Sequence, residues 1–313
     1  MYGLHGILSY AFAAILALLV VASVVTALLM RLHPTRSYTA VKLRIQTWWW
    51  LAALLFFSLS FHPTVAVVVL AVLSFMAFKE FLSLIPTRPI DNRVLLLAYL
   101  AIPVQYLWVS MAWYGMFIIF IPVYVFLLLP LRMVVGGETK GFLRAAGTLH
   151  WGLMTTVFSI SHVAYLLALP PHAGAHGEVR GEMLVFYLLV LTQLNDVAQF
   201  LWGKWLGRHP IAPRVSPNKT VEGLAGGLAT TTLLAWALGP WFTPLSPLFS
   251  TLAGLGICLF GFTGDVVISA VKRDIGVKDT GSFLPGHGGI LDRLDSLTYT
   301  APLFFHFVYY FCY

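Results

Sequence analysis

The sequence predicts an all-α, polytopic integral membrane protein with no large soluble domain. Of its 313 residues, 59% are hydrophobic and only 10% are charged, and the mean hydropathy is +0.85. In a soluble domain about a quarter of the residues are charged. Long uncharged apolar runs recur along the chain, and about 20 such residues are enough to cross a hydrocarbon core.

The first apolar run extends from Leu4 to Met30. It lacks a cationic leader and has no small-residue cleavage site before Arg31, so we expect a retained membrane helix and not a signal peptide. The run is followed by further candidates, which bring the expected number of crossings to about ten. They lie at residues 47–61, 64–78, 94–111, 113–131, 147–169, 183–202, 221–241, 247–268 and 297–312.

The stretch from Gln46 to Phe78 decides the count. It is too long for one crossing of a hydrocarbon core of about 30 Å and short for two. His62 and Pro63 lie at its middle, and a proline there predicts a tight hairpin of two short helices. A single helix would leave nine crossings.

The cations predict the topology. A net charge of +7 in a soluble protein would suggest nucleic acid, but membrane proteins collect cations in cytoplasmic loops, so we expect no nucleic-acid partner. Ten crossings with an outside N-terminus place 18 of the 19 Lys and Arg residues inside and leave only Arg180 outside. Both termini are then outside. The inside segments are residues 31–46, 79–93, 132–146, 203–220 and 269–295.

Cysteine and histidine usage excludes two kinds of site. Cys258 and Cys312 lie in separate apolar segments, which gives neither a disulfide framework nor a cysteine zinc site. The ten histidines are scattered along the chain, so we expect no histidine zinc site. Gly223, Gly226 and Gly227 are expected to permit close helix packing.

Residues 265–295 are the expected chemical centre because they hold five of the twelve carboxylates, interleaved with cations. Asp265 lies within an apolar run, where a charge is costly unless it faces a polar cavity or a cation. The turn Pro285–Gly289 offers unobstructed backbone amides, as a phosphate cradle requires. Carboxylates beside cations suit a magnesium-bound polyphosphate.

The same residues carry a family resemblance. The segment Ser269 to Asp295, with Lys272-Arg273, Pro285-Gly-His-Gly-Gly289 and Asp292-Arg-Leu-Asp295, resembles the signature of the phosphatidate cytidylyltransferases, also called CDP-diacylglycerol synthases. Asn195-Asp196 and Ser216–Gly223 resemble a second block of that family. The resemblance covers roughly residues 190–300. It divides the chain into a transmembrane scaffold at 1–180 and a catalytic transmembrane region at 181–313 with the signature at 269–295.

One departure from the family pattern is visible. Family members commonly have Ala-Tyr within a few residues of Asn195-Asp196, whereas this chain has Val197-Ala198-Gln199-Phe200. We interpret this as a divergent subgroup. The departure concerns the lipid or head-group preference more than the reaction type.

The resemblance implies transfer of CMP from CTP to phosphatidate, which gives CDP-diacylglycerol and pyrophosphate in phospholipid biosynthesis. The expected location is the cytoplasmic face of a bacterial inner membrane. Mg²⁺ is the expected cofactor, a second cation and a homodimer are left open, and CTP, phosphatidate and membrane lipid are the expected partners. The attacking lipid phosphate is already anionic, so catalysis should rest on positioning and charge neutralisation.

We assign roles to the matching residues on this basis. His287 has two equal interpretations, as a phosphate donor or as a side chain that locks the glycine-rich turn. The expected metal ligands are Asp265, Asp292 and Asp295. The expected catalytic residues are Asp265, Lys272, Arg273, Asp292 and Arg293, and the expected substrate-binding residues are Asp196, Lys219, Glu222, Lys278, Asp279, His287, Gly288 and Gly289.

Three alternatives belong to other classes. A secondary transporter also places charges in membrane helices, but it should show repeat symmetry, which the sequence lacks. A CTP-dependent lipid kinase would also bind CTP, a lipid and a metal ion, but it would transfer the γ-phosphate of CTP and not CMP. A purely structural membrane protein is hard to reconcile with the concentrated carboxylates.

Overall fold

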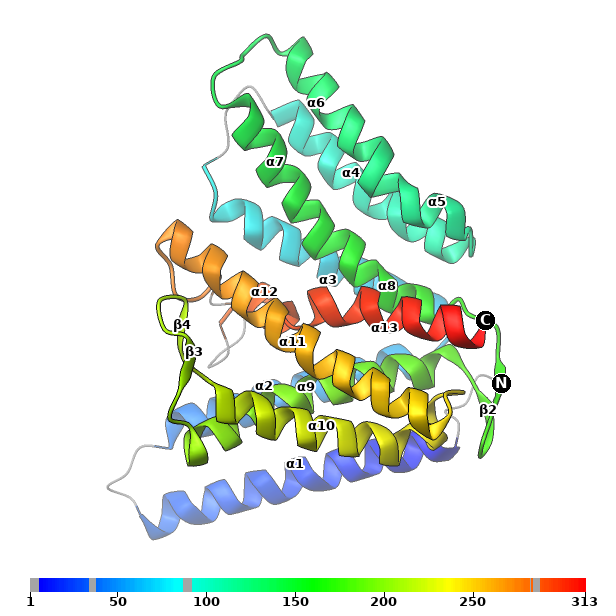
Figure 1. Ribbon diagram of the computed structural model, residues 1–313, viewed down its shortest axis with the longest axis vertical. Coiled ribbons are helices and arrows are strands. Elements are labelled where there is room, and N and C mark those ends of the chain that lie inside the picture. The colour runs from blue at the N-terminus through cyan, green and yellow to red at the C-terminus, as the bar shows by residue number, and fades with distance from the viewer. Residues whose placement is uncertain (1–5, 34–37, 87–91, 282, 284–287) are drawn as a thin grey trace.

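Helices make up most of the computed structural model, which describes residues 6–33, 38–86, 92–281, 283 and 288–313 (Figure 1). The strands form two short antiparallel hairpins, β1 (His172–Gly174) with β2 (Gly177–Val179) and β3 (Pro210–Ala212) with β4 (Ser216–Thr220). The helices are α1 (Gly6–Leu32), α2 (Thr39–Ser60), α3 (Pro63–Ser83), α4 (Asn92–Ser110), α5 (Tyr114–Ile119), α6 (Phe126–Val135), α7 (Phe142–Leu153), α8 (Ser159–Leu166), α9 (Gly181–Leu206), α10 (Val221–Phe242), α11 (Pro247–Ile275), α12 (Leu291–Leu294) and α13 (Leu297–Cys312). The π-helical turns η2 (Phe120–Val125) and η3 (Met154–Phe158) join α5 to α6 and α7 to α8.

Every predicted apolar run corresponds to a helical segment, which confirms the all-α membrane class. Seven segments of the described chain are long and apolar enough to cross a membrane. The other runs form α2, the α7–η3–α8 segment and the 16-residue α13. The ten-crossing count itself stays a prediction. The seven segments are α1, α3, α4, Tyr114–Val135, α9, α10 and α11.

The proline at the middle of the stretch from Gln46 to Phe78 separates two helices, as predicted, but the helices have 22 and 21 residues and are not short, because they extend beyond both ends of that stretch. α2 ends at Ser60 and α3 begins at Pro63. Proline is tolerated at the first helical position because its missing N–H would have no intrahelical partner there. The His62 side chain completes the start of α3 by accepting a hydrogen bond from Thr64 N at 3.3 Å.

The last turns of α3 are held against α7. A Cβ atom at Gly152 would lie 2.5 Å from Phe81 Cε1, so glycine is what lets the Phe81 ring reach the α7 backbone. The ring centroids of Phe81 and Trp151 are 5.4 Å apart. Phe81 also shares a buried cluster with Ile268 of α11 and Leu291 of α12. This packing brings the end of α3 to the signature segment.

Glycines on α10 allow close packing against α9, as the sequence predicts. A Cβ at Gly223 would lie 2.8 Å from Gln199 O, and one at Gly227 would overlap the Gln199 side chain. A Cβ at Gly226 would overlap Trp202 in the same way. The close approach of α9 and α10 aligns the Asn195-Asp196 turn of α9 with the end of β4.

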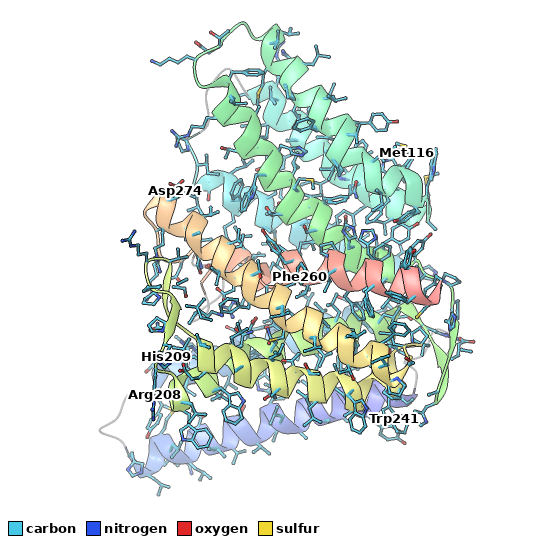
Figure 2. All side chains as sticks on the ribbon, in the orientation of Figure 1. Met116, Arg208, His209, Trp241, Phe260 and Asp274 are labelled. Carbon is cyan, nitrogen blue, oxygen red and sulfur yellow. The ribbon has the colours of Figure 1, made fainter. Side chains whose placement is uncertain are left out.

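The connections at the two ends of the helices differ in charge. Figure 1 shows the β3–β4 hairpin and the end of α11 at one edge of the molecule, and the start of α1 and the C-terminus at the opposite edge. In Figure 2, Arg208, His209 and Asp274 lie toward the first edge, whereas Met116 and Trp241 lie toward the other. The two cation-rich segments of the catalytic region therefore share one end, as the cation count requires.

We predict that this shared end is cytoplasmic. In a variant whose native cysteines are replaced, Asp274→Cys in intact cells should react with a membrane-impermeant maleimide only after permeabilisation. Ala173→Cys in the β1–β2 hairpin should react without it. Labelling of Asp274→Cys from outside, together with protection of Ala173→Cys, would reverse the predicted topology.

Candidate active site

One face of α11 carries the ionisable side chains of the site. Asp265, Ser269 and Lys272 follow one another at intervals of four and three residues, so they lie along one side of the helix. The Ser269 hydroxyl lies 3.3 Å from Asp265 Oδ1. The helix ends at Gly276, whose φ of +84° is the left-handed conformation that terminates many helices. The chain then turns back, and the signature returns to this face.

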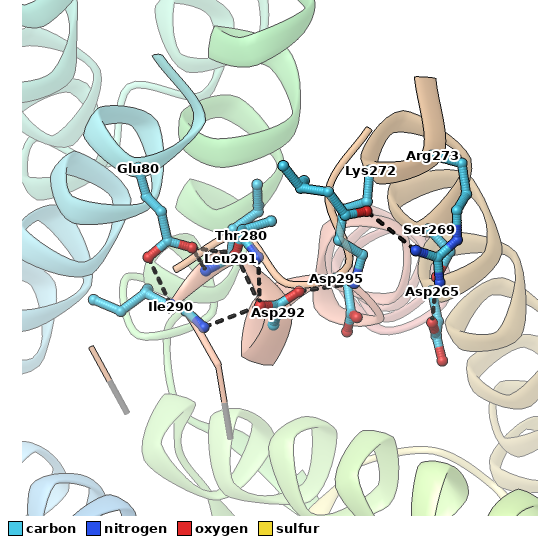
Figure 3. Close-up of polar contacts among 12 residues, drawn as sticks. Glu80, Asp265, Ser269, Lys272, Arg273, Thr280, Ile290, Leu291, Asp292 and Asp295 are labelled. Carbon is cyan, nitrogen blue, oxygen red and sulfur yellow. Dashed lines mark hydrogen bonds and ion pairs between the residues drawn. The ribbon is translucent and has the colours of Figure 1, made fainter. Parts of the chain in front are cut away.

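Asp292 and Lys272 form a buried ion pair at the centre of the returning segment (Figure 3). Lys272 Nζ donates to Asp292 Oδ1 at 2.8 Å, and the side chains are 11% and 5% exposed. Asp292 Oδ2 accepts from Thr280 N and Gly289 N at 2.9 Å each, and lies 3.0 Å from Thr280 Oγ1. Burial disfavours the charged form of Asp292, but these hydrogen bonds outweigh it and lower the pKa of Asp292.

Two glycines of the predicted phosphate-cradle turn lie against this carboxylate. Gly288 has φ +82°, and a Cβ atom there would lie 2.6 Å from Asp292 Oδ2. Gly289 donates its amide to the same oxygen. In the structure the backbone of Gly288 and Gly289 thus packs against Asp292 and donates to it. A contact of this turn with substrate stays a prediction. His287 lies outside the described residues.

Glu80 of α3 is a site residue that the sequence reasoning missed. Its carboxylate accepts hydrogen bonds from Ile290 N at 2.9 Å, from Leu291 N at 3.1 Å and from the Thr280 hydroxyl. It therefore lies against the signature although it is some 200 residues away in the chain. The one signal that could have found it is a carboxylate at the end of an apolar run, where ionisable groups tend to be functional.

A second ion pair joins the second block of the family resemblance to the helix that leads into the signature. Lys219 Nζ, at the end of β4, lies 2.5 Å from Asp265 Oδ2 of α11, and both side chains are about four-fifths buried. The ammonium group also lies 5.5 Å from the centroid of the Phe262 ring. A charge on a membrane helix is costly unless it is paired, and this contact provides the pairing for Asp265.

Two more carboxylates belong to the same cluster. Ser296 Oγ lies 3.0 Å from each carboxylate oxygen of Asp196 on α9, and Ser296 N donates to Asp295 Oδ1 at 2.7 Å. Arg293 interacts electrostatically with both Asp196 and Asp295. The Nε atom of Arg293 is buried and has no hydrogen-bond partner among the described residues. We call Asp196, Lys219, Asp265, Arg293 and Asp295 the carboxylate cluster.

The pKa shifts show a shortage of positive charge in the carboxylate cluster. Burial, and then repulsion from Asp265 and Asp196, raises the pKa of Asp295 well above its usual range. For Lys219, burial opposes the charge, but attraction to Asp265, Asp196 and Asp295 outweighs burial and raises the pKa of Lys219. Three carboxylates thus surround a lysine that stays protonated at neutral pH.

The donor set fits magnesium if the substrate completes the coordination. No group of three or more His, Cys, Asp and Glu side chains in the described part of the chain could hold a metal ion alone. Magnesium usually takes one or two carboxylates from the protein and its other ligands from water and phosphates. The hard oxygens of Asp265, Asp295 and Asp196 suit this arrangement, whereas Asp292 is only 5% exposed and is already held by Lys272 and by the backbone amides of Thr280 and Gly289.

Several predicted site residues lie outside both ion pairs. Arg273 donates to Val215 O at 3.3 Å and Val277 O at 3.1 Å, which ties α11 to the β3–β4 hairpin. Glu222 accepts from Arg208 N at 3.0 Å and from His209 N at 3.2 Å. Both therefore shape the loops around the site. Lys278 and Asp279 are exposed.

A cytidylyltransferase family profile matches residues 42–311, which is most of the chain. The chain belongs to the cytidylyltransferase family. It is accordingly a nucleotidyltransferase of the membrane, and the match extends over the scaffold as well as the signature.

Named relatives resemble the chain to different extents. It is 44% identical over 301 residues to the uncharacterized protein YnbB of Escherichia coli K12, which covers 96% of this chain and 98% of that protein. It is 43% identical over 130 residues to a phosphatidate cytidylyltransferase of Staphylococcus aureus COL, covering 40% of this chain and 50% of that enzyme. The phosphatidate cytidylyltransferase of Bacillus subtilis 168 is 41% identical over 126 residues, 40% of this chain and 47% of that enzyme. The aligned segment thus spans about half of each named enzyme.

Gln199, one of the residues that depart from the family pattern, lies between packed helices of this cytidylyltransferase. Gln199 is buried, donates to Asn195 Oδ1 at 3.0 Å and lies 3.7 Å from Cys258 Sγ. The glycine opposite it, Gly227, leaves space for the longer side chain. Gln199 therefore fills the α9–α10–α11 interface one turn from Asp196, and its influence on substrate preference stays a prediction.

The buried ion pair gives a stability prediction. Lys272→Met removes the charge that faces Asp292 and keeps an unbranched side chain, so it leaves a buried carboxylate without its cation. The free energy of unfolding should fall by about 3 kcal/mol, measured by denaturant or thermal unfolding in detergent. The control, Lys278→Met on the exposed loop, should change it by less than about 0.5 kcal/mol. Equal losses in the two variants would contradict the stabilising role of the buried pair.

Proposed function

We propose that this cytidylyltransferase transfers CMP from CTP to phosphatidate and releases pyrophosphate, at the cytoplasmic end of its helices in a bacterial inner membrane. The observation that carries the proposal is the contact of Lys219 with Asp265, because it brings the second sequence block that resembles the phosphatidate cytidylyltransferases to the helix that leads directly into their signature. The names of the partly aligned relatives support the same reaction. The product would be CDP-diacylglycerol.

Catalysis of this reaction requires mainly that the substrates are positioned and that the charge on their phosphates is neutralised. An oxygen of the lipid phosphate attacks the α-phosphorus of CTP, the new P–O bond forms, and the bond from the α-phosphorus to the oxygen of the leaving pyrophosphate breaks. The attacking oxygen is already anionic, so no strong general base is needed. The barrier is lowered where cations face the charge that develops on the phosphates.

The carboxylate cluster would hold the metal. Asp265 and Asp295 would bind magnesium with help from Asp196, and magnesium would neutralise the nucleotide phosphates and the leaving pyrophosphate. Asp292, which the sequence also predicts as a metal ligand, would instead keep Lys272 in place beside this cluster, because its buried carboxylate is held by Lys272 and by the backbone amides of Thr280 and Gly289.

The cations would bind the phosphates at two ends of the site. Lys219 lies at the start of α10, where the chain enters the membrane, which suits a lipid phosphate. Arg293 has a buried Nε atom without a partner in the described structure, which suits a nucleotide phosphate. Lys272, Arg273 and Lys278 follow along the end of α11 and the loop after it, and would add positive charge around the polyphosphate.

The reaction can be tested with purified protein, phosphatidate and CTP labelled in either the α- or the γ-phosphate. Label from the α-phosphate should enter the lipid only when magnesium is present, whereas label from the γ-phosphate should leave as pyrophosphate. Lipid labelled from the γ-phosphate would show the CTP-dependent kinase reaction instead. Asp265→Asn should lower turnover by more than about a hundred-fold, since it loses a metal ligand. Asp274→Asn, on the exposed end of α11, should retain near-normal turnover.

The assignment of Lys219 to the lipid gives a further prediction. A lysine that binds one phosphate is worth about 1.5 to 3 kcal/mol as a charged hydrogen bond, so Lys219→Ala should weaken apparent phosphatidate affinity by roughly ten-fold to a hundred-fold. The affinity for CTP should change little. Each substrate is titrated at saturation of the other. A loss confined to CTP would reverse the assignment, and equal losses would mean that Lys219 bridges both phosphates.

A further inference from the structure

Glu80 connects the N-terminal helices to the signature segment. Its two carboxylate oxygens accept from the amides of Ile290 and Leu291 and from the Thr280 hydroxyl (Figure 3). These amides lie at the start of α12, where a helix has no intrahelical acceptors for its first N–H groups. Glu80 therefore supplies the hydrogen-bond acceptors that the start of α12 lacks.

The contacts of Glu80 continue to the buried ion pair. Thr280, which touches Glu80 through its hydroxyl, donates its backbone N–H to Asp292 at 2.9 Å. Asp292 in turn accepts from Lys272 Nζ at 2.8 Å. A chain of direct contacts thus runs from α3 through Thr280 and Asp292 to α11. Because Thr280 holds both carboxylates, a shift of the Glu80 side chain would displace the backbone that holds Asp292.

The surrounding residues are shaped to admit Glu80. A Cβ atom at Gly289 would overlap Glu80 Oε1, and one at Gly281 would lie 3.1 Å from Glu80 Oε2. Next to it, Phe81 of α3 packs in one buried cluster with Leu291 of α12 and Ile268 of α11. The glycines permit the approach of the carboxylate, and the apolar cluster fixes the distance between α3 and the signature.

We propose that Glu80 is a positioning residue for the nucleotidyl transfer. It holds described parts of the signature segment, Thr280 and residues 288–291, in the conformation in which Asp292 pairs with Lys272 and Arg293 interacts electrostatically with Asp196 and Asp295. Glu80 reaches the reacting groups only through this segment and does not bind substrate. The inference rests on the proposed function for its kinetic part, and on the structure alone for the placement of the segment.

The first test measures the segment itself. Glu80→Gln keeps the size of the side chain but replaces one acceptor oxygen with a donor and removes the charge. A hydrogen bond to a charged group is worth roughly ten-fold to a hundred-fold in an equilibrium constant, so amide hydrogen exchange of residues 288–294 should rise about ten-fold or more. Exchange in α9 and α10 should not change. The matched control is Glu182→Gln in the first turn of α9, which should leave the exchange of residues 288–294 unaltered.

The second test measures turnover. With CTP and phosphatidate each titrated, Glu80→Gln should lower kcat about ten-fold or more while either KM changes by less than about three-fold, because the cations that bind ground-state phosphates remain. Thr280→Val removes the hydroxyl that donates to Glu80 and so breaks the same chain of contacts at its other partner. The double variant should therefore be little worse than Glu80→Gln alone, whereas independent roles would multiply the two losses.

The outcomes separate this inference from the proposed function. Unchanged exchange of residues 288–294 in Glu80→Gln, or raised exchange with unchanged kcat, would overturn the positioning role. If Glu80→Gln does not fold, Thr280→Val alone must show the raised exchange and lowered kcat for the inference to stand. A native protein that transfers no CMP to phosphatidate would overturn the proposed function, while the exchange measurement would still decide whether Glu80 holds the segment.

Discussion

The architecture of the site depends on compensating charge at the ends of membrane helices. Asp265 lies on a helix that is long and apolar enough to cross the bilayer, and it is stabilised there because β4 brings Lys219 within 2.5 Å. That contact requires the β3–β4 hairpin to fold over the end of α11, where Arg273 donates to the hairpin backbone. A second pair, Lys272 with Asp292, requires the chain after α11 to return to the same helix face. The two pairings together determine how the loops of the catalytic region are folded.

The glycines of the signature follow from the second pairing. Carboxylates accept hydrogen bonds from backbone amides only at close range, and a side chain on Gly288 or Gly289 would occupy the space of Asp292 or Glu80. The sequence pattern suggested amides held open for a substrate phosphate. In the structure the same lack of side chains lets acidic residues of the protein approach. A glycine-rich turn beside several carboxylates is thus explained by the packing of those carboxylates before any ligand is considered.

The sequence was sufficient for features that depend on local pattern. Every apolar run predicted from hydropathy is helical, Pro63 marked the break between α2 and α3, and the glycines of α10 were correctly taken as packing residues. The sequence was not sufficient to predict which distant residues contact one another. Glu80 meets Thr280 across 200 positions, and no periodicity or motif spacing encodes such a contact. Glu222, expected at the substrate, accepts from the backbone amides of Arg208 and His209, because the pairing of β3 with β4 brings the residues before β3 beside the start of α10.

The ion pair that stabilises Lys219 also competes with any phosphate for it. In the structure Lys219 is paired with Asp265, and the carboxylate cluster has three carboxylates against Lys219 and Arg293. Moving Lys219 to a phosphate would leave Asp265 uncompensated, which is costly at this depth. In the proposed reaction a divalent cation at Asp265 would replace the charge that Lys219 withdraws, and the phosphates would supply the negative charge that Lys219 needs. Lipid phosphate and metal should therefore bind with positive cooperativity, because each removes the electrostatic cost of the other.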